Sequence, residues 1–255
     1  MKKTLMITLL SATALTLFAT SADAVEKIDK TDVGVSFKSN DVNEIGDNKP
    51  FKDNLAVVWK PTSFEFGQQK AAAYSQVFSN TVGDSANNPQ FVIVNDDRPD
   101  AKRTGKWDLK ASLTNMKTTK EGSSVTLPSK LTMTLGGLQS YAIGNLLGPD
   151  QDYIAPYPTE VDKPDGTKKN ITDFAPTGDL ADFKLGDGAA GTDQPVELEA
   201  GGSAVNILGR DKNQTKGGFA TKIKDVKLVV ANANDAGAAG HEFAGQVIWS
   251  LNDTP

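Results

Sequence analysis

The sequence predicts an all-β fold, an antiparallel β-sandwich or a related barrel with long loops and little helix. Short apolar runs rich in Val, Leu, Phe and Thr recur along the chain, and turn-forming stretches such as GDSANNP and KPDGTKKN separate them. Two of these runs alternate apolar and polar residues with the two-residue period of a strand. The chain has no cysteine, so disulfides cannot brace it and the fold depends on its apolar core.

The predicted strands are LAVVW at 55–59, FEFG at 64–67, FVIV at 91–94, KWDLKASL at 106–113, SVTL at 124–127, KLTMTL at 130–135, YAIG at 141–144, PVELEA at 195–200, AVNIL at 204–208, VKLVVANA at 226–233 and FAGQVIWSL at 243–251. The stretch QQKAAAYSQVFSN at 68–80 fits either a short helix or a strand. The region 148–191 is loop-like, with several Pro, Gly and Asp residues, and its role is open.

Two runs show the alternation most clearly, and each contains a Trp-x-Leu tripeptide. The apolar positions are Trp107, Leu109, Ala111 and Leu113 in the first run, and Phe243, Val247, Trp249 and Leu251 in the second. Alternation with one polar face indicates half-buried antiparallel strands, so the Trp and Leu of each tripeptide share a face.

The first residues predict a secretory signal peptide at 1–24. Lys2 and Lys3 precede a short apolar stretch, which ends at the small-residue site Ala22-Asp23-Ala24. A membrane anchor is the alternative, but the stretch is shorter than the roughly 20 residues that a spanning helix needs. We therefore expect a secreted protein without membrane insertion, in which residues 25–54 form a loosely ordered lead-in with one short strand at 33–37, and residues 55–255 form a single domain.

The charge balance and the residue inventory exclude several function classes. The net charge of −5 argues against nucleic acid, which needs a basic face. A serine triad needs an activated serine beside a histidine, but the single histidine, His241, accompanies no G-x-S-x-G elbow. One histidine without cysteine also makes a zinc site improbable. The sequence predicts no cofactor.

Carboxylates leave two further alternatives open. Glu197 and Glu199 would share one strand face, and Asp96, Asp97 and Asp100 would form an acidic loop. A glycosidase needs two carboxyl groups roughly 5–10 Å apart, which a sequence cannot establish. Calcium prefers oxygen ligands from Asp-rich loops, but no stretch matches the twelve-residue calcium loop and Asp-Gly pairs first indicate turns. A protein without catalytic activity is the favoured interpretation.

The two tripeptides, Trp107-Asp108-Leu109 and Trp249-Ser250-Leu251, carry a resemblance to a known family. With a signal peptide and a cysteine-free β body around them, the chain resembles the small WxL-domain surface proteins of Gram-positive bacteria. That resemblance implies non-covalent attachment to the cell wall, with peptidoglycan as ligand. It also implies assembly with other WxL proteins and with a membrane-anchored WxL-interacting protein.

The six motif residues admit two roles. Exposed tryptophan rings would stack on sugars and form a glycan platform. Two strands that each turn a Trp and a Leu to one face would instead build a buried cross-strand cluster. Large aromatics in half-buried strands usually belong to the core, so we expect Trp107 and Trp249 to face inward and the two tripeptides to meet across the sheet or the core.

Overall fold

The computed structural model describes residues 27–34, 54–82, 90–103, 105–118, 122, 125–143, 160–162, 168–170, 172–176, 180–211 and 216–254. The signal peptide predicted at 1–24 lies outside them, as do parts of the 148–191 region. The described parts of that region, which the sequence predicts to be loop-like, contain short paired strands instead. In these ranges, no helix is both long and apolar enough to cross a membrane.

The described chain is built almost entirely of strands, as the sequence predicts. They are β1 (Lys27–Gly34), β2 (Leu55–Trp59), β3 (Ser63–Glu65), β4 (Gln76–Ser79), β5 (Phe91–Asp96), β6 (Lys106–Leu113), β7 (Met116–Thr118), β8 (Thr126–Leu127), β9 (Ser129–Leu135), β10 (Gln139–Ile143), β11 (Glu160–Asp162), β12 (Lys168–Asn170), β13 (Thr172–Pro176), β14 (Phe183–Leu185), β15 (Gly188–Ala189), β16 (Gln194–Glu199), β17 (Val205–Arg210), β18 (Gly217–Val230) and β19 (Phe243–Thr254). One short 3-10 helix, Asp100–Lys102, follows β5. The uncertain stretch at 68–80 is a loop followed by strand β4.

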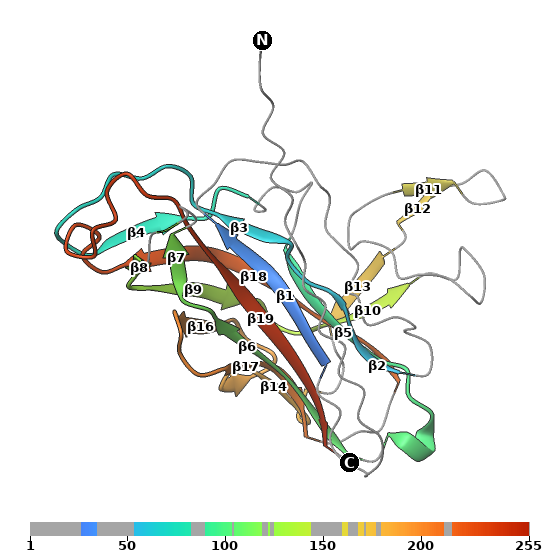
Figure 1. Ribbon diagram of the computed structural model, residues 1–255. Helices are drawn as coiled ribbons and strands as arrows, with labels where there is room; N and C mark the ends of the chain where they lie inside the picture. Colours follow the sequence, from blue (N-terminus) through green and yellow to red (C-terminus); the bar gives the residue numbers. More distant parts are fainter. Residues whose placement is uncertain are drawn as a thin grey trace.

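The strands form two main sheets. Of the two predicted architectures, a sandwich and a barrel, the structure is the sandwich. The first sheet has the order β15-β14-β17-β6-β19-β1-β3, with β7 and β8 continuing from β19. The second has the order β13-β10-β18-β5-β2, with β9 and β4 also pairing with β18 and β16 pairing with β9. Figure 1 shows that β19 and β1 lie side by side along almost their whole length. Neither sheet closes on itself among the described strands.

The final strand β19 is the centre of the first sheet. It pairs with β6 on one side and with β1 on the other, both antiparallel. The sequence analysis places a strand at 33–37, whereas the structure places it at Lys27–Gly34. This segment, KIDKTDVG, is polar and has no apolar alternation. Its strand character comes from pairing along β19 and, in parallel, along β3.

The longest strand, β18, holds the second sheet together. Only its second half was predicted as a strand, because the KGG before it reads as a turn. Gly218 is needed inside the strand and not in a turn, because a Cβ at this position would lie 2.5 Å from the carbonyl oxygen of Tyr141 on β10. At Asp225, which has a φ of 51°, the register shifts between Lys224 and Lys227. The residues before this bulge pair with β5 and β10 and those after it pair with β4, while β9 pairs with β18 on both sides of it.

Two kinds of strand explain where the core lies. On β6 and β16 buried and exposed side chains alternate, as expected for strands with one wet face. On β2 and β5 every side chain is buried, which matches their continuous apolar runs. The main core fills the space between the sheets, and a smaller cluster around Trp59, Ile93 and Tyr141 covers the other face of the second sheet.

Candidate functional site

The two Trp-x-Leu tripeptides lie on neighbouring strands. Strands β6 and β19 are antiparallel, and their register sets Leu109 opposite Leu251, Trp107 opposite Asp253 and Trp249 opposite Ala111. Both rings point into the core, where Trp107 is 1% and Trp249 0% exposed. The tripeptides therefore meet across the sheet on its inner face, and neither ring is available to a ligand at the surface.

Trp249 is tied to two other segments by hydrogen bonds. Its indole Nε1 donates to Thr31 Oγ1 on β1 at 2.6 Å, and the Thr31 hydroxyl in turn donates to the carbonyl oxygen of Pro61. Both Thr31 and Trp249 are fully buried. Since a buried N–H without a partner is costly, this relay fixes β19, β1 and the connection before β3 relative to one another.

Trp107 lies in an aromatic cluster instead. Its ring centroid is 6.4 Å from that of Phe183 and 6.1 Å from that of Phe219. The Arg210 guanidinium, on the strand beside Trp107, lies 4.7 Å from the centroid of the Phe183 ring. Among the described residues, Trp107 Nε1 has no hydrogen-bond partner. This ring is held by packing and by the cation–π contacts around it.

The middle residues of the tripeptides face away from the core. Asp108 accepts a hydrogen bond from Asn252 Nδ2 at 2.8 Å and lies 3.6 Å from Lys110 Nζ. Ser250 is partly buried on the same outer face of the sheet. Their side chains therefore contribute to the solvent face of β6 and β19, while the Trp and Leu residues contribute to the core.

A buried ion cluster follows the second tripeptide. The Arg98 guanidinium donates to Asp96 at 2.9 Å and 3.0 Å, and it also contacts Asp253 on β19. Burial lowers the pKa of Arg98, but the hydrogen bonds and charges of Asp96 and then Asp253 outweigh it and raise that pKa. Arg98 thus joins the end of β5 to the end of β19.

The acidic loop considered as a metal or acid–base site is neutralised by basic side chains. Asp96 is paired with Arg98, Asp97 lies 3.3 Å from Lys216, and Asp100 is paired with Arg103. The described residues contain no group of three His, Asp or Glu side chains placed to hold a metal ion. The loop is a structural joint in this part of the chain.

The second carboxylate pair is also engaged at the surface. Glu197 and Glu199 share the exposed face of β16, and Glu197 accepts a hydrogen bond from Lys130 at 2.6 Å. That bond raises the pKa of Lys130. On the preceding turn, the Lys224 ammonium and then the Gly137 N–H lower the pKa of Asp193. These are ordinary ion pairs at the surface.

A cavity of about 650 Å³ opens at the other end of β19, beside its first residue, Phe243. Its walls come from the β3–β4 connection, from β4 and from the β18–β19 connection, which lie at the left of Figure 1. The two connections are joined by a hydrogen bond from Asn234 N to Ala72 O at 3.1 Å. The residues that line it are Glu65, Gly67, Gln68, Gln69, Lys70, Ala71, Gln76, Phe78, Leu127, Leu228, Val230, Ala233, Asn234, Ala238, Ala239, Gly240, His241, Glu242 and Phe243.

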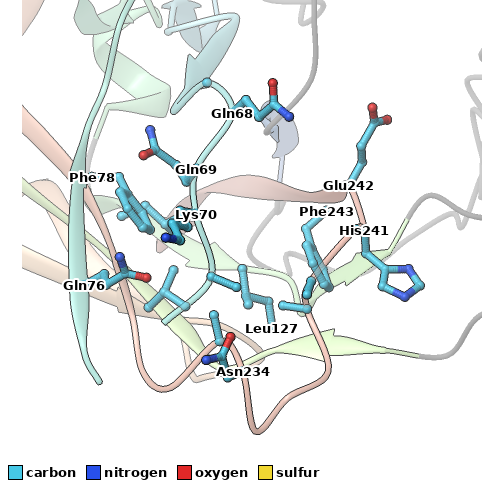
Figure 2. A pocket seen from close by; sticks show the side chains of 18 of the residues that line it. Gln68, Gln69, Lys70, Gln76, Phe78, Leu127, Asn234, His241, Glu242 and Phe243 are labelled. Atoms are coloured by element: carbon cyan, nitrogen blue, oxygen red, sulfur yellow. The ribbon is translucent and has the colours of Figure 1, made fainter. Parts of the chain in front are cut away.

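The cavity has an apolar floor and an amide-rich rim. Buried Leu127, Leu228 and Phe243 form part of the floor, and Gln76 stands on the wall opposite Phe243 (Figure 2). The Gln76 Oε1 atom is buried and has no hydrogen-bond partner among the described residues. A buried acceptor without a donor is uncommon in folded proteins, and this one belongs to a side chain that lines the cavity, although its neighbours cover the atom itself.

His241 lies at the rim of this cavity but does not point into it. Its Nδ1 is 3.3 Å from Thr118 Oγ1, and Figure 2 shows the ring directed away from the other labelled side chains. His241 belongs to the connection before β19 and lies two residues ahead of the first residue of that strand, Phe243.

The cavity was not predicted from the sequence. Its walls combine residues near 65–78, Leu127 and residues near 228–243, which are far apart in the chain. The only local signal was the run QQKAAAYSQ, whose three glutamines stand next to small residues. That composition fits a polar loop as well as a site.

Comparison with known families gives one match. The family model described as "WxL domain surface cell wall-binding" matches residues 37–255. No curated protein and no solved structure matches the chain.

Proposed function

The chain belongs to the WxL family of surface cell wall-binding domains, and from that premise we propose that it is a secreted, non-catalytic protein that binds peptidoglycan without a covalent bond. The family description supports association with the cell wall and a location at the cell surface. Secretion is supported by the signal peptide predicted at 1–24.

The observation that carries the choice of peptidoglycan is the cavity at the start of β19. This concave surface of the described domain offers both apolar and neutral polar contacts, as sugars require. Anionic wall polymers are a poorer fit, since the protein has a net charge of −5 and the cavity rim carries Glu65 and Glu242 against Lys70.

The six motif residues have a structural role in this proposal. Trp107, Leu109, Trp249 and Leu251 build the core on which the sheet depends, and Asp108 and Ser250 face outward beside them. The wall-binding surface then lies elsewhere on the same domain.

Sedimentation of residues 25–255 with peptidoglycan sacculi tests the proposal, after attached proteins and anionic polymers have been stripped from the sacculi. We expect the protein in the pellet, and we expect muramidase digestion of the sacculi to return it to the supernatant. Protein that stays in solution at all sacculus concentrations would rule out direct binding to the glycan.

A second candidate function is a subunit of a surface protein complex, held by a membrane-anchored WxL-interacting protein. It is favoured by two exposed apolar side chains, Tyr74 at 70% and Val77 at 59%, on and just before β4. Among the described strands β4 pairs only with β18, so its other edge is open to a partner. Failure to pellet with bare sacculi, together with retention on protein-bearing walls, would favour this function.

A further inference from the structure

We propose that the cavity beside Phe243 is a subsite for an N-acetylated amino sugar, whose acetamido N–H bonds to Gln76 Oε1 and whose methyl group packs on the apolar floor. The inference deepens the proposed peptidoglycan binding and rests on it. It names the chemical group that is recognised and the residue that recognises it.

The first step is the unpartnered acceptor. Gln76 Oε1 is buried, and within the described part of the structure no donor reaches it. A buried acceptor left without a donor costs free energy that the fold does not recover. Because neighbouring atoms cover Oε1 in the unliganded protein, a ligand reaches it only when the Gln76 side chain turns toward the cavity it lines. A ligand that then supplies an N–H removes that cost, so the site favours ligands with a donor over those without one.

The second step is the floor beneath that acceptor. Leu127, Leu228, Val230 and Phe243 are each at most 5% exposed and present only hydrocarbon to the cavity. A sugar hydroxyl would lose its hydration against this surface without a partner. An acetamido group combines a donor with a methyl group at one carbon, which matches a single acceptor above an apolar floor.

The third step concerns the rim. Gln68, Gln69 and Asn234 carry side-chain amides that donate and accept at once, which suits the ring hydroxyls of a sugar. Their charged neighbours do not add up to a cationic site, so phosphate or carboxylate groups gain no attraction here. The rim therefore fits a neutral, polyhydroxylated ligand.

The fourth step is an exposed aromatic side chain on the β3–β4 connection, which also supplies part of the cavity wall. Tyr74 lies two residues before Gln76 on the same connection and is 70% exposed. Tyrosine offers a flat apolar face with a polar tip, on which a pyranose ring can stack. A second sugar unit would lie on Tyr74 while the acetamido group of its neighbour occupies the cavity.

The test uses a tetramer of N-acetylglucosamine and its fully de-N-acetylated counterpart as probes, titrated into residues 25–255 by calorimetry or ligand-observed NMR. We expect the acetylated tetramer to bind about tenfold to a hundredfold more tightly, because its methyl group packs on the apolar floor, whereas the ammonium group of the other probe keeps its N–H donors but must lose hydration against hydrocarbon. The de-N-acetylated tetramer is cationic and the protein acidic, so simple electrostatics would produce the opposite order.

Two variants locate the effect and one controls for it. Gln76→Leu removes the acceptor at similar volume, and Ala238→Leu narrows the cavity that Ala238 lines while leaving the Gln76 amide in the sequence. Both are expected to weaken binding of the acetylated tetramer at least about tenfold. Val77→Ala is the matched control, because this exposed neighbour on β4 points to the opposite side of the strand.

The outcomes separate this inference from the function on which it rests. A wild-type protein that pellets with sacculi but binds both tetramers equally, or a Gln76→Leu variant that binds like wild type, would overturn the acetamido subsite and leave wall binding intact. If a stem peptide competes with sacculi for the protein and the acetylated tetramer does not, the acetamido subsite is also overturned. Tetramer binding without pelleting would support the subsite and contradict peptidoglycan as the ligand.

Discussion

The two ends of strand β19 are built on opposite principles. Toward its C-terminal end, Trp249 donates to Thr31 and Asp253 contacts Arg98, so these two side chains find partners inside the protein, although Trp107 Nε1 on the neighbouring strand does not. At its first residue, Phe243, the strand borders a cavity in which Gln76 Oε1 is buried without a donor. We refer to these as the closed end and the open end.

The difference between the two ends indicates two separate roles, stabilisation of the fold and recognition of the ligand. The Trp-x-Leu residues lie at the closed end or in the middle of the sheet, fully buried. They secure the last strand against β6 and β1 and so hold the first residue of β19 in place. Recognition in this view belongs to the open end, and the motif supports it from a distance.

The strongest way to break this comparison is to truncate a motif ring. Trp249→Ala is expected to lower the free energy of unfolding by about 3–5 kcal/mol, the range for a buried tryptophan replaced by alanine. Urea unfolding measures the loss. Trp107→Ala should behave likewise, and wall binding should fall only where the protein unfolds. Unchanged stability with lost sedimentation would place the rings in the binding surface instead.

A second change tests the ion cluster at the closed end. Arg98→Met leaves Asp96, whose side chain is 0% exposed, without its partner. We expect a loss of about 3 kcal/mol, the lower end of the range for breaking a buried pair. The lower end applies because Asp253 is still 28% exposed and can be hydrated. Thermal unfolding measures it, with the surface variant Lys130→Met as control, and equal melting of the two would contradict a structural role for the cluster.

Much of the closed end follows from the sequence. Strict alternation in KWDLKASL and FAGQVIWSL predicts two half-buried strands, and the burial patterns of β6 and β19 have this form. Local sequence patterns could not predict which distant segments pair with one another. The strand at Lys27–Gly34 has no apolar alternation, and it forms because it pairs with β19. The pair Gly217-Gly218 resembles a turn in the sequence, but Gly218 lies in a strand and leaves room for the backbone of Tyr141.

The open end shows why the site was harder to predict. A carboxylate-rich loop attracts attention in a sequence, but Asp97 is neutralised by Lys216, which is 119 positions away. The residue of interest, Gln76, stands in a run that fits a helix, a strand or a loop equally well. Its importance arises only from burial without a partner, which depends on how two remote connections pack.

A smaller change isolates the indole hydrogen bond. Thr31→Val keeps the shape of the side chain but removes the acceptor for Trp249 Nε1 and the donor to Pro61 O. The expected loss of stability is about 1–3 kcal/mol, the cost of buried polar groups left unpaired. Thr31→Ser retains the hydroxyl and is the matched control. If the two variants unfold at the same denaturant concentration, the relay does not stabilise β19.

The smallest expected effect lies at the open end and has the opposite sign. Gln76→Leu removes a buried acceptor that no described residue satisfies, so the free energy of unfolding should stay the same or rise by up to about 1 kcal/mol. Denaturant unfolding without ligand measures this, with Val77→Ala alongside to report the cost of any change on β4. A loss of more than about 1 kcal/mol would mean that the Gln76 side chain is needed by the fold itself. If stability is retained while tetramer binding falls, the buried Gln76 acceptor serves recognition and not the fold. Mutations at the two ends of β19 would then change the free energy of unfolding with opposite signs.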